Sequence, residues 1–392
     1  MRIICLGVYI LALAAAAASL RFDDPEGLLG RRECRHGLCR ADQITAAIEL
    51  EGEGGSLRGP ELFGSLLAIR PADAYSWAAQ GVFLNSKKEY ALEAQRAMEK
   101  AVELAPAVAP IRMRKVNYCL EKGDRDCVLS DGRAVMGLSG RFDEVLYTYY
   151  RMLGVEPGEV LQSGIPGEIR ARRGWLVHWA RQGEPVGGVE GIWRQLRREG
   201  LVDEGVTERV VGALLARSEG ERAWGYWRDY EGTLPGAADA GELVTNGGFG
   251  RAPAKVAFDW SLGEVKGVKL RREKGLEVEF GGEENVRWGH VRQRIRVEPG
   301  ARYRLGVEVE HEELTTDQGP RMRVWAVDGG RGVLAETAMW RGSGARRREE
   351  VEFVTPAGTR WVEVGLAREA SQKFDSKIAG RLRVIGVSLR RR

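Results

Sequence analysis

The 392-residue sequence has only four histidines, and none lies in an HExxH motif or another paired metal-binding arrangement. It also lacks a Gly-x-Ser-x-Gly elbow and a Gly-rich loop that ends in Gly-Lys-Ser or Gly-Lys-Thr. These absences exclude the short motifs of zinc hydrolases, α/β-type serine hydrolases and P-loop nucleotide-binding proteins. The sequence therefore predicts no enzyme and no cofactor.

Carboxylate pairs are present, but they do not identify a glycosidase dyad. Glu308 and Glu310 alternate along one segment, and Glu312 and Glu313 follow directly. Charged strands always offer such pairs on their solvated face, so no acid and nucleophile can be assigned. A glycan-cleaving enzyme is the least favoured alternative, and His311 is the first residue to test for it.

Excess charge is small as well. The 60 basic and 56 acidic residues leave a net charge of +4, and no continuous basic stripe is visible. Nucleic acid is therefore not an expected partner. The mean hydropathy of −0.32 argues against a protein with many membrane spans. A chain of this length is expected to form at least two domains.

One long apolar run is present, at the N-terminus. Ile3–Ala18 carries no charge and follows Arg2, which predicts an export signal over residues 1–20. Ala16–Ala18 supplies the small residues of a cleavage site, yet the run is close to the ~18 residues that a spanning helix needs. A cleaved signal peptide and a retained membrane anchor both stay open. Either one places the rest of the chain outside the cytoplasm, facing or secreted into a periplasm.

Cysteines are few, and four of the five lie outside the apolar run. An oxidising compartment favours disulfides, and the local pairs Cys34 with Cys39 and Cys119 with Cys127 each close a short loop. Unpaired thiols and a zinc site are the alternatives. The zinc site is disfavoured because neither pair has the spacing of a standard zinc knuckle. Residues 21–41 are interpreted as a Cys-containing connecting segment.

Residues 42–230 have the periodicity of helices, with apolar residues three and four apart and Gly or Pro as breaks. Helix-length segments joined by short turns predict antiparallel packing of neighbours. The predicted helical segments include Glu89–Leu104, Ile111–Leu120, Phe142–Leu153, Gly174–Arg181, Val189–Arg198, Glu208–Arg217 and Ser218–Tyr230.

One helix pair carries a repeat-like pattern of large and small residues. The pattern consists of Trp77, Gly81, Ala94, Met98, Ala101 and Pro106, with a second Pro at position 71, 35 residues before Pro106. It resembles the tetratricopeptide repeat over about Leu62–Pro106. Leu84 departs from it, because an aromatic residue is usual there. The resemblance implies a helical array that binds a protein partner; a plain helical bundle is the alternative.

The periodicity changes after a Gly- and Pro-containing linker at residues 231–242. From residue 243 to 392, apolar and charged residues alternate every two positions, as in half-buried antiparallel strands. The fold class is therefore multidomain, with an α-helical array followed by an antiparallel β-sandwich or jelly roll. The clearest strand segments are 276–280, 291–297, 303–309, 322–326, 362–366 and 385–389.

Three segments of this β region carry a second resemblance: Leu243–Phe249, Phe258–Trp260 and Gln293–Leu305. They resemble the opening strand, the Trp segment and the central strand of jelly-roll carbohydrate-binding modules. This implies a galactose-binding-like sandwich that binds glycans without cleaving them. Such modules commonly hold a structural calcium. Gly250 stands where many of them have an acidic residue, so no metal ligand is assigned here.

A glycan-binding face needs flat aromatic rings and polar groups on a rigid sheet. If Val291 and Ile295 point inward, the side chains between them point outward. The same alternation of inward and outward side chains, applied to the other strands, predicts the candidate glycan-binding residues. They are Trp288, His290, Arg292, Arg323, Trp325 and Trp361. The alternative is that the Trp side chains cover a sheet edge or the helical domain. Trp260 is instead expected in the core.

These observations predict a non-enzymatic envelope scaffold. Its repeats would engage a protein partner, its sandwich would contact cell-surface or exported polysaccharide, and only its N-terminal segment would meet the membrane. The architecture is similar to that of accessory proteins of bacterial surface polysaccharide production, which is an analogy. A pure protein–protein scaffold without glycan binding is the main alternative.

Overall fold

The computed structural model describes Ile44 and residues 59–183, 186–234, 239, 241–330, 332–373 and 376–392. The predicted leader 1–20 and the pair Cys34 and Cys39 lie outside the described residues. In the part of the chain that is described, no helix is both long and apolar enough to cross a membrane. Two compact units are present, one that ends at Gly174 and one that spans Trp175–Arg392.

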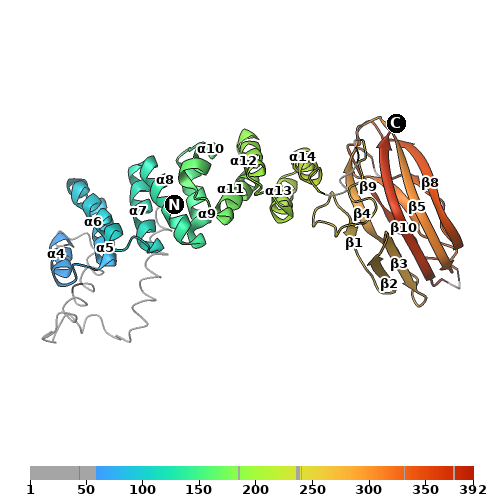
Figure 1. Ribbon diagram of the computed structural model, residues 1–392, viewed down its shortest axis with the longest axis horizontal. Helices are drawn as coiled ribbons and strands as arrows, with labels where there is room; N and C mark the ends of the chain where they lie inside the picture. The colour runs from blue at the N-terminus through green and yellow to red at the C-terminus, as the bar shows by residue number, and fades with distance from the viewer. Residues whose placement is uncertain are drawn as a thin grey trace. The chain divides into compact units, whose positions relative to one another are not determined.

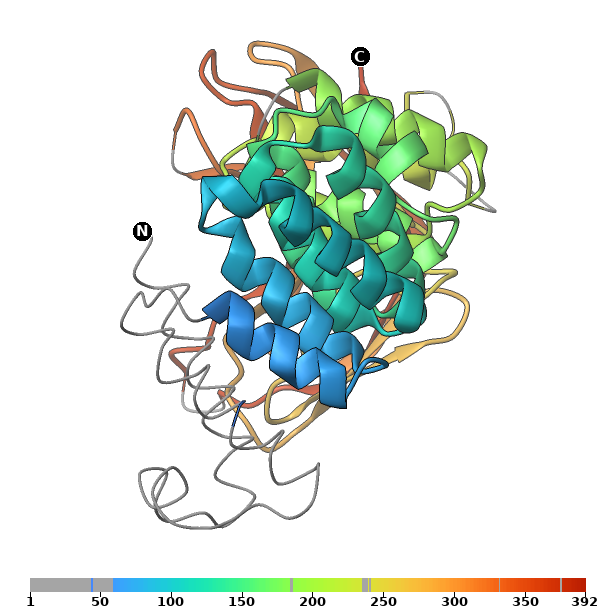
Figure 2. The same ribbon diagram turned by 90° about the vertical axis from the view of Figure 1, so that its left-hand side faces the viewer.

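Helices come first along the chain and antiparallel strands follow, so the predicted fold class is confirmed (Figure 1). Figure 2 shows the first helices, coloured blue to teal, as successive rods that lie side by side. The helices are α4 (Gly59–Ile69), α5 (Ala74–Asn85), α6 (Ala91–Leu104), α7 (Ala109–Lys122), α8 (Arg125–Leu138), α9 (Asp143–Met152), α10 (Pro157–Glu159), α11 (Ile169–Gln182), α12 (Val186–Arg198), α13 (Glu204–Ala216) and α14 (Gly220–Glu231).

The repeat-like residues form the contact between α5 and α6. Gly81 of α5 faces α6 so closely that an added Cβ would lie 2.8 Å from Cγ of Met98 and 3.1 Å from the carbonyl oxygen of Ala94. Ala94, Met98 and Ala101 are buried on the facing side of α6. Small residues thus let the two helix backbones approach, and Met98 fills the remaining gap.

Helix α8 lies within the region predicted to be helical, although its interior holds Gly132 and a buried charge. An added Cβ at Gly132 would collide with the Tyr150 hydroxyl of α9, so the absence of a side chain at Gly132 leaves room for Tyr150. Asp131 beside it is buried and bridges to Arg112 at 2.8 Å and Lys115 at 2.9 Å. These contacts come from α7 and α9, so tertiary packing outweighs the low helix propensity of the segment.

The turn between α7 and α8 is fixed from both sides. Gly123 ends α7 in the left-handed region at φ 70°, and the Asp124 side chain accepts a hydrogen bond from the Cys127 N–H at 3.1 Å. Across this turn Cys119 and Cys127 form a disulfide, one of the two predicted local pairs. Cys119 and Cys127 are therefore joined by a covalent bond between their sulfur atoms and do not act as zinc ligands.

The β region folds into two antiparallel five-stranded sheets. The β9 sheet has the order β1-β4-β9-β6-β7, and the β10 sheet has the order β2-β3-β10-β5-β8. The strands are β1 (Ser261–Leu262), β2 (Val268–Arg272), β3 (Leu276–Gly281), β4 (Trp288–Arg296), β5 (Arg302–Leu314), β6 (Arg321–Ala326), β7 (Gly332–Glu336), β8 (Gly342–Val354), β9 (Trp361–Arg368) and β10 (Ala379–Arg391). Edge strands β7 and β8 were missed because they are largely exposed and lack apolar alternation.

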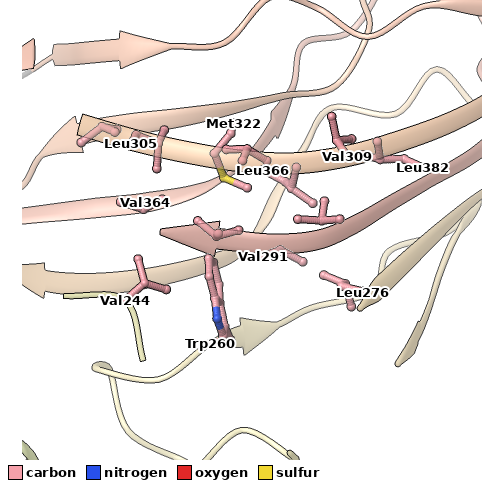
Figure 3. Packing of buried hydrophobic residues seen from close by; sticks show 14 of the residues in the cluster. Val244, Trp260, Leu276, Val291, Leu305, Val309, Met322, Val364, Leu366 and Leu382 are labelled. Atoms are coloured by element: carbon pink, nitrogen blue, oxygen red, sulfur yellow. The ribbon is translucent and has the colours of Figure 1, made fainter. Parts of the chain in front are cut away.

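The inward-facing residues of the two sheets form one hydrophobic core (Figure 3). Val364 and Leu366 of β9 point into it, as do Val291 of β4 and Leu305 of β5. Trp260 is buried here as predicted, and its indole N–H donates to the Asn246 carbonyl at 3.1 Å. Burial of each such side chain contributes roughly 1.5–3 kcal/mol, so the alternating residues hold the sheets together.

Helix α14 packs on the sandwich through aromatic side chains. The Trp224 ring lies 5.1 Å from the Phe258 ring and 6.2 Å from the Trp361 ring, measured between centroids. Trp227 is fully buried, and its indole N–H donates to Thr245 at 3.3 Å. The second compact unit thus includes α12–α14 together with the strands.

Replacing both Cys119 and Cys127 by Ser is expected to lower the free energy of unfolding of the first unit. Their separation of eight residues closes a small loop, and the entropy lost by the unfolded chain on closure corresponds to about 2–3 kcal/mol. Urea unfolding followed by circular dichroism would measure the difference. A reductant should shift the parent protein toward the variant, and an unchanged midpoint in the variant would contradict the prediction.

Phe258→Ala is expected to destabilise the second unit by about 3–5 kcal/mol, because it removes a fully buried ring between Trp224 and Trp361 and leaves a cavity. Phe258→Leu keeps most of the volume and should cost only about 1 kcal/mol. Thermal unfolding monitored by Trp fluorescence would compare the two. Equal effects of Ala and Leu would show that the ring does not hold α14 to the sandwich.

Candidate functional site

Strand β9 lies at the centre of the outer surface where the candidate residues meet. Glu363 of β9 is paired with Arg294 of β4 on one side and with Trp325 of β6 on the other. Gly365, two residues along, is likewise flanked by Arg292 and Arg323. We call this surface the β9 face; it consists of Arg292, Arg294, Glu363, Arg323 and Trp325. The structure therefore brings Arg292, Arg323 and Trp325 together as parity predicts.

Gly365 keeps the centre of this face free of a side chain. An added Cβ would lie 2.9 Å from Cβ of Arg292 and still closer to the Val291 carbonyl oxygen. Glycine is therefore required for the close pairing of β9 with β4. Arg292 and Arg323 lie on the two strands that flank Gly365. Their Cα atoms are about 10 Å apart, because neighbouring strands are ~4.8 Å apart.

Glu363 is shared between two of the guanidinium groups of this face. Glu363 accepts from both Arg294 at 3.2 Å and Arg292 at 3.5 Å, so one carboxylate serves two cations. The Arg292 side chain is 56% exposed, so a single weak ion pair leaves it free to donate to a ligand. Such charged donors suit the hydroxyl and carboxyl oxygens of sugars.

Arg323 is the fixed cation of the face. It bridges Glu336 of β7 and Glu369 just after β9, at 2.7 Å each. The hydrogen bond from Arg323 lowers the pKa of Glu369 below its ordinary range. Burial alone would raise the pKa of Glu336, but hydrogen bonds and charge from Arg323 and Arg321 lower it. Both carboxylates therefore stay ionised and orient Arg323.

Trp325 is the aromatic side chain of the face. It is half-buried, lies opposite Glu363, and is paired on its other side with Val333 of β7, which is 48% exposed. An apolar ring next to charged groups on a rigid strand is the combination that a sugar ring requires. By contrast, among the described residues of the β10 sheet, the aromatic side chains Phe280, Tyr303 and Phe353 are buried.

The outward orientation predicted for Trp288 is wrong. A β-bulge between Trp288 and Val291 shifts the register of β4 against β9, so parity counted from Val291 fails at Trp288. The Trp288 ring lies in the core beside Phe280, and its indole N–H donates to the Gly263 carbonyl at 3.0 Å. His290 lies within the bulge and is exposed, at the end of the β9 face.

Trp361 lies on the outer side of β9 but is partly covered. Its ring stacks on Phe258 at 5.6 Å and meets Trp224 of α14 at 6.2 Å. Its neighbour across the sheet, Arg296, bridges to Glu221 of α14. Helix α14 thus covers one end of the outer surface of the β9 sheet, as the alternative for these Trp side chains expected.

The residues suggested for an enzyme are held in structural contacts. His311 is buried; its Nδ1 lies 3.1 Å from the Gly342 carbonyl oxygen and its Nε2 lies 3.1 Å from Nη1 of Arg347. Because guanidinium groups only donate, Nε2 accepts from Arg347, and Nδ1 faces the Gly342 carbonyl, so both ring nitrogens are engaged by the protein. Glu310 beside it binds Arg383 at 2.6 Å.

The described residues do not fit the calcium that the resemblance implies. Asp259, a buried acidic side chain of this region, is occupied by Arg251 at 2.7 Å and by the N–H groups of Ala254 and Trp260. Burial raises the pKa of Asp259 despite these partners. Nowhere in the described ranges do three or more His, Cys, Asp or Glu side chains gather to hold a metal ion.

Sequence reasoning missed Glu336, Glu369 and Gly365 as parts of this surface. Glu336 comes from an edge strand that parity did not predict, and Glu369 follows the end of β9. Only the pairing of β7 with β6 and of β6 with β9 places these three residues around Arg323. No local pattern in the sequence carries that register.

Comparisons with known proteins find a likeness in structure alone. No family model matches the sequence, and no curated protein matches it. Carbohydrate-binding modules match the C-terminal β region. A CBM4 structure matches 38% of this chain and 99% of its own, with 11% identity and a TM-score of 0.30. The CBM22-1 xylan-binding domain of Paenibacillus barcinonensis Xyn10C matches 40% of this chain and 97% of its own, with 16% identity and a TM-score of 0.25. TmCBM61, solved with β-1,4-galactotriose, matches 38% of this chain and 99% of its own, with 16% identity and a TM-score of 0.26.

Arg323→Gln is expected to destabilise the protein at neutral pH and not at low pH. The pKa values of Glu336 and Glu369 are depressed, so their contribution is present above the ordinary glutamate pKa of 4.5 and is lost as pH falls through the lower folded-state values. Both carboxylates are more than a third exposed, so solvent screening limits the loss to about 0.5–1 kcal/mol. Urea midpoints at pH 7 and at about pH 2 would test this; an equal gap at both would contradict it.

Proposed function

We propose that this protein is a non-enzymatic glycan-binding protein whose β9 face contacts a polysaccharide. The observation that supports this most directly is the placement of Trp325 beside Glu363, with Arg292 and Arg323 on the next pair of positions. Carbohydrate-binding modules are among its structural neighbours, which is consistent with the proposal.

The chemistry of this face suits sugars. The half-buried ring of Trp325 offers apolar area for sugar C–H groups at a low cost in side-chain entropy. Arg292 and Glu363 offer a donor and an acceptor for hydroxyl groups. The antiparallel pairing of β4, β9 and β6 holds these groups at fixed spacing. The conformational entropy lost on binding is therefore mainly that of the ligand and not that of the protein.

We further propose that the helical region is a tetratricopeptide-like array that engages a protein partner. The close contact of Gly81 with Met98 supports the repeat interpretation. With the predicted export signal, this gives an envelope scaffold, anchored in or secreted across the inner membrane, whose sandwich reaches a cell-surface or exported polysaccharide.

One alternative has specific support from the structure. A pure protein–protein scaffold is favoured by Trp361, which packs against Trp224 of a helix and is only partly available to a ligand. Glycan cleavage would require two carboxylates about 5–10 Å apart in a cleft. Incubation with polysaccharide and assay of reducing ends separates cleavage from binding.

Trp325→Ala is expected to weaken polysaccharide binding by about tenfold or more, because a central aromatic contact is lost. Affinity electrophoresis of the full chain in gels that contain soluble polysaccharides would measure the retardation. Tyr75→Ala is the matched control, since Tyr75 is an aromatic residue 48% exposed in the other compact unit. Equal mobility of both variants and the parent in every gel would refute glycan binding by the β9 face.

A further inference from the structure

A pocket of about 310 Å³ lies between the turn that joins α13 to α14 and the start of β9. All of it belongs to the second compact unit. Ser218, with φ 63°, turns the chain between the two helices. The lining residues are Ser218, Glu219, Gly220, Glu221, Arg222, Arg360 and Trp361.

Trp361 forms one wall of this pocket. An added Cβ on Gly220 would lie 3.2 Å from Cζ2 of the Trp361 ring and 3.9 Å from its Nε1, so the ring edge with the indole nitrogen faces the turn. Phe258 and Trp224 support the ring from the protein side. The Trp361 indole N–H donates to no residue within the described ranges, and it is available to a ligand oxygen.

The two carboxylates that line the pocket already form ion pairs with arginines. Glu219 accepts from Arg217 at 2.9 Å and also pairs with Arg222, and Glu221 pairs with Arg296 at 2.5 Å. The pKa of Glu219 is lowered: burial would raise it, but hydrogen bonds from the two arginines prevail. Glu219 is therefore ionised, and both acidic groups are compensated by arginines.

Arg360 adds a cation that has no such partner. Its side chain is exposed and forms no ion pair with any described residue. Asp328 lies nearby, but its Oδ1 accepts the backbone N–H groups of Arg360 and Trp361 at 2.9 Å each. The pocket thus presents one uncompensated guanidinium and one free indole N–H, and both are donors. A ligand oxygen that carries negative charge satisfies both.

We propose that this pocket binds the carboxylate of an acidic sugar residue, with Arg360 and Trp361 as the contacting residues. The inference deepens the proposed function and rests on it. Trp361 is two residues from Glu363 on the same side of β9, about 7 Å along the strand. A glycan chain on the β9 face can therefore reach the pocket, and the helical part of the unit contributes directly to its specificity.

The test compares acidic polysaccharides with their neutral forms. Polygalacturonate, alginate and hyaluronate are each paired with the fully methyl-esterified polymer, and binding to the full chain is measured by affinity electrophoresis at fixed ionic strength. The parent protein is expected to bind at least one acidic polymer about tenfold more tightly than its ester, the size of one charge-assisted hydrogen bond.

Two substitutions locate the effect. Arg360→Gln should lower affinity for the acidic polymer about tenfold and leave binding of the ester unchanged. Trp361→Phe keeps an aromatic ring against Phe258 but removes the indole N–H together with part of the ring area, so affinity for the acidic polymer should fall by a smaller factor, roughly threefold. Arg302→Gln is the matched control: Arg302 is exposed on β5 of the other sheet and forms no ion pair with a described residue.

The possible outcomes separate this inference from the proposal on which it rests. Binding that depends on Trp325 but treats acid and ester alike overturns the acidic pocket and leaves glycan binding intact. An equal loss in Arg360→Gln and Arg302→Gln also overturns it, because general charge would then explain the preference. Retention of no polysaccharide at all refutes glycan binding itself, and the pocket proposal with it.

Discussion

The structure of the second unit depends on the antiparallel pairing of β9 between β4 and β6. Because side chains alternate along β9, Val362, Val364 and Leu366 enter the core while Trp361 and Glu363 face outward. The same pairing fixes both the apolar interior that stabilises the sandwich and the spacing of the charged groups outside it. A slip of one residue would exchange the two faces and destroy both.

Helix α14 makes the outer surface asymmetric. Its Trp224 covers Phe258 and part of Trp361, and its Glu221 neutralises Arg296 at the same end. The opposite end of the surface, with Arg292 and Trp325, has no such cover from this helix. Helix α14 therefore determines which aromatic and charged groups stay exposed at this end of the outer surface.

Local patterns predicted most of the architecture. The three-to-four-residue rhythm located α6, α7, α9 and α11–α14, and the two-residue rhythm located six of the ten strands. Strands at the edges of the sheets were missed. The exposure of β7 and β8 removes the apolar alternation by which a strand is recognised in the sequence.

The sequence by itself determined the order of a helical and a β region and the outward orientation of Arg292, Arg323 and Trp325, since each follows from side-chain periodicity along one strand or helix. Only the tertiary structure decided that Trp288 turns inward at a bulge, that Glu336 and Glu369 orient Arg323, and that Trp361 meets α14. Register between strands and packing between elements depend on partners far apart in the chain, and no local period records them.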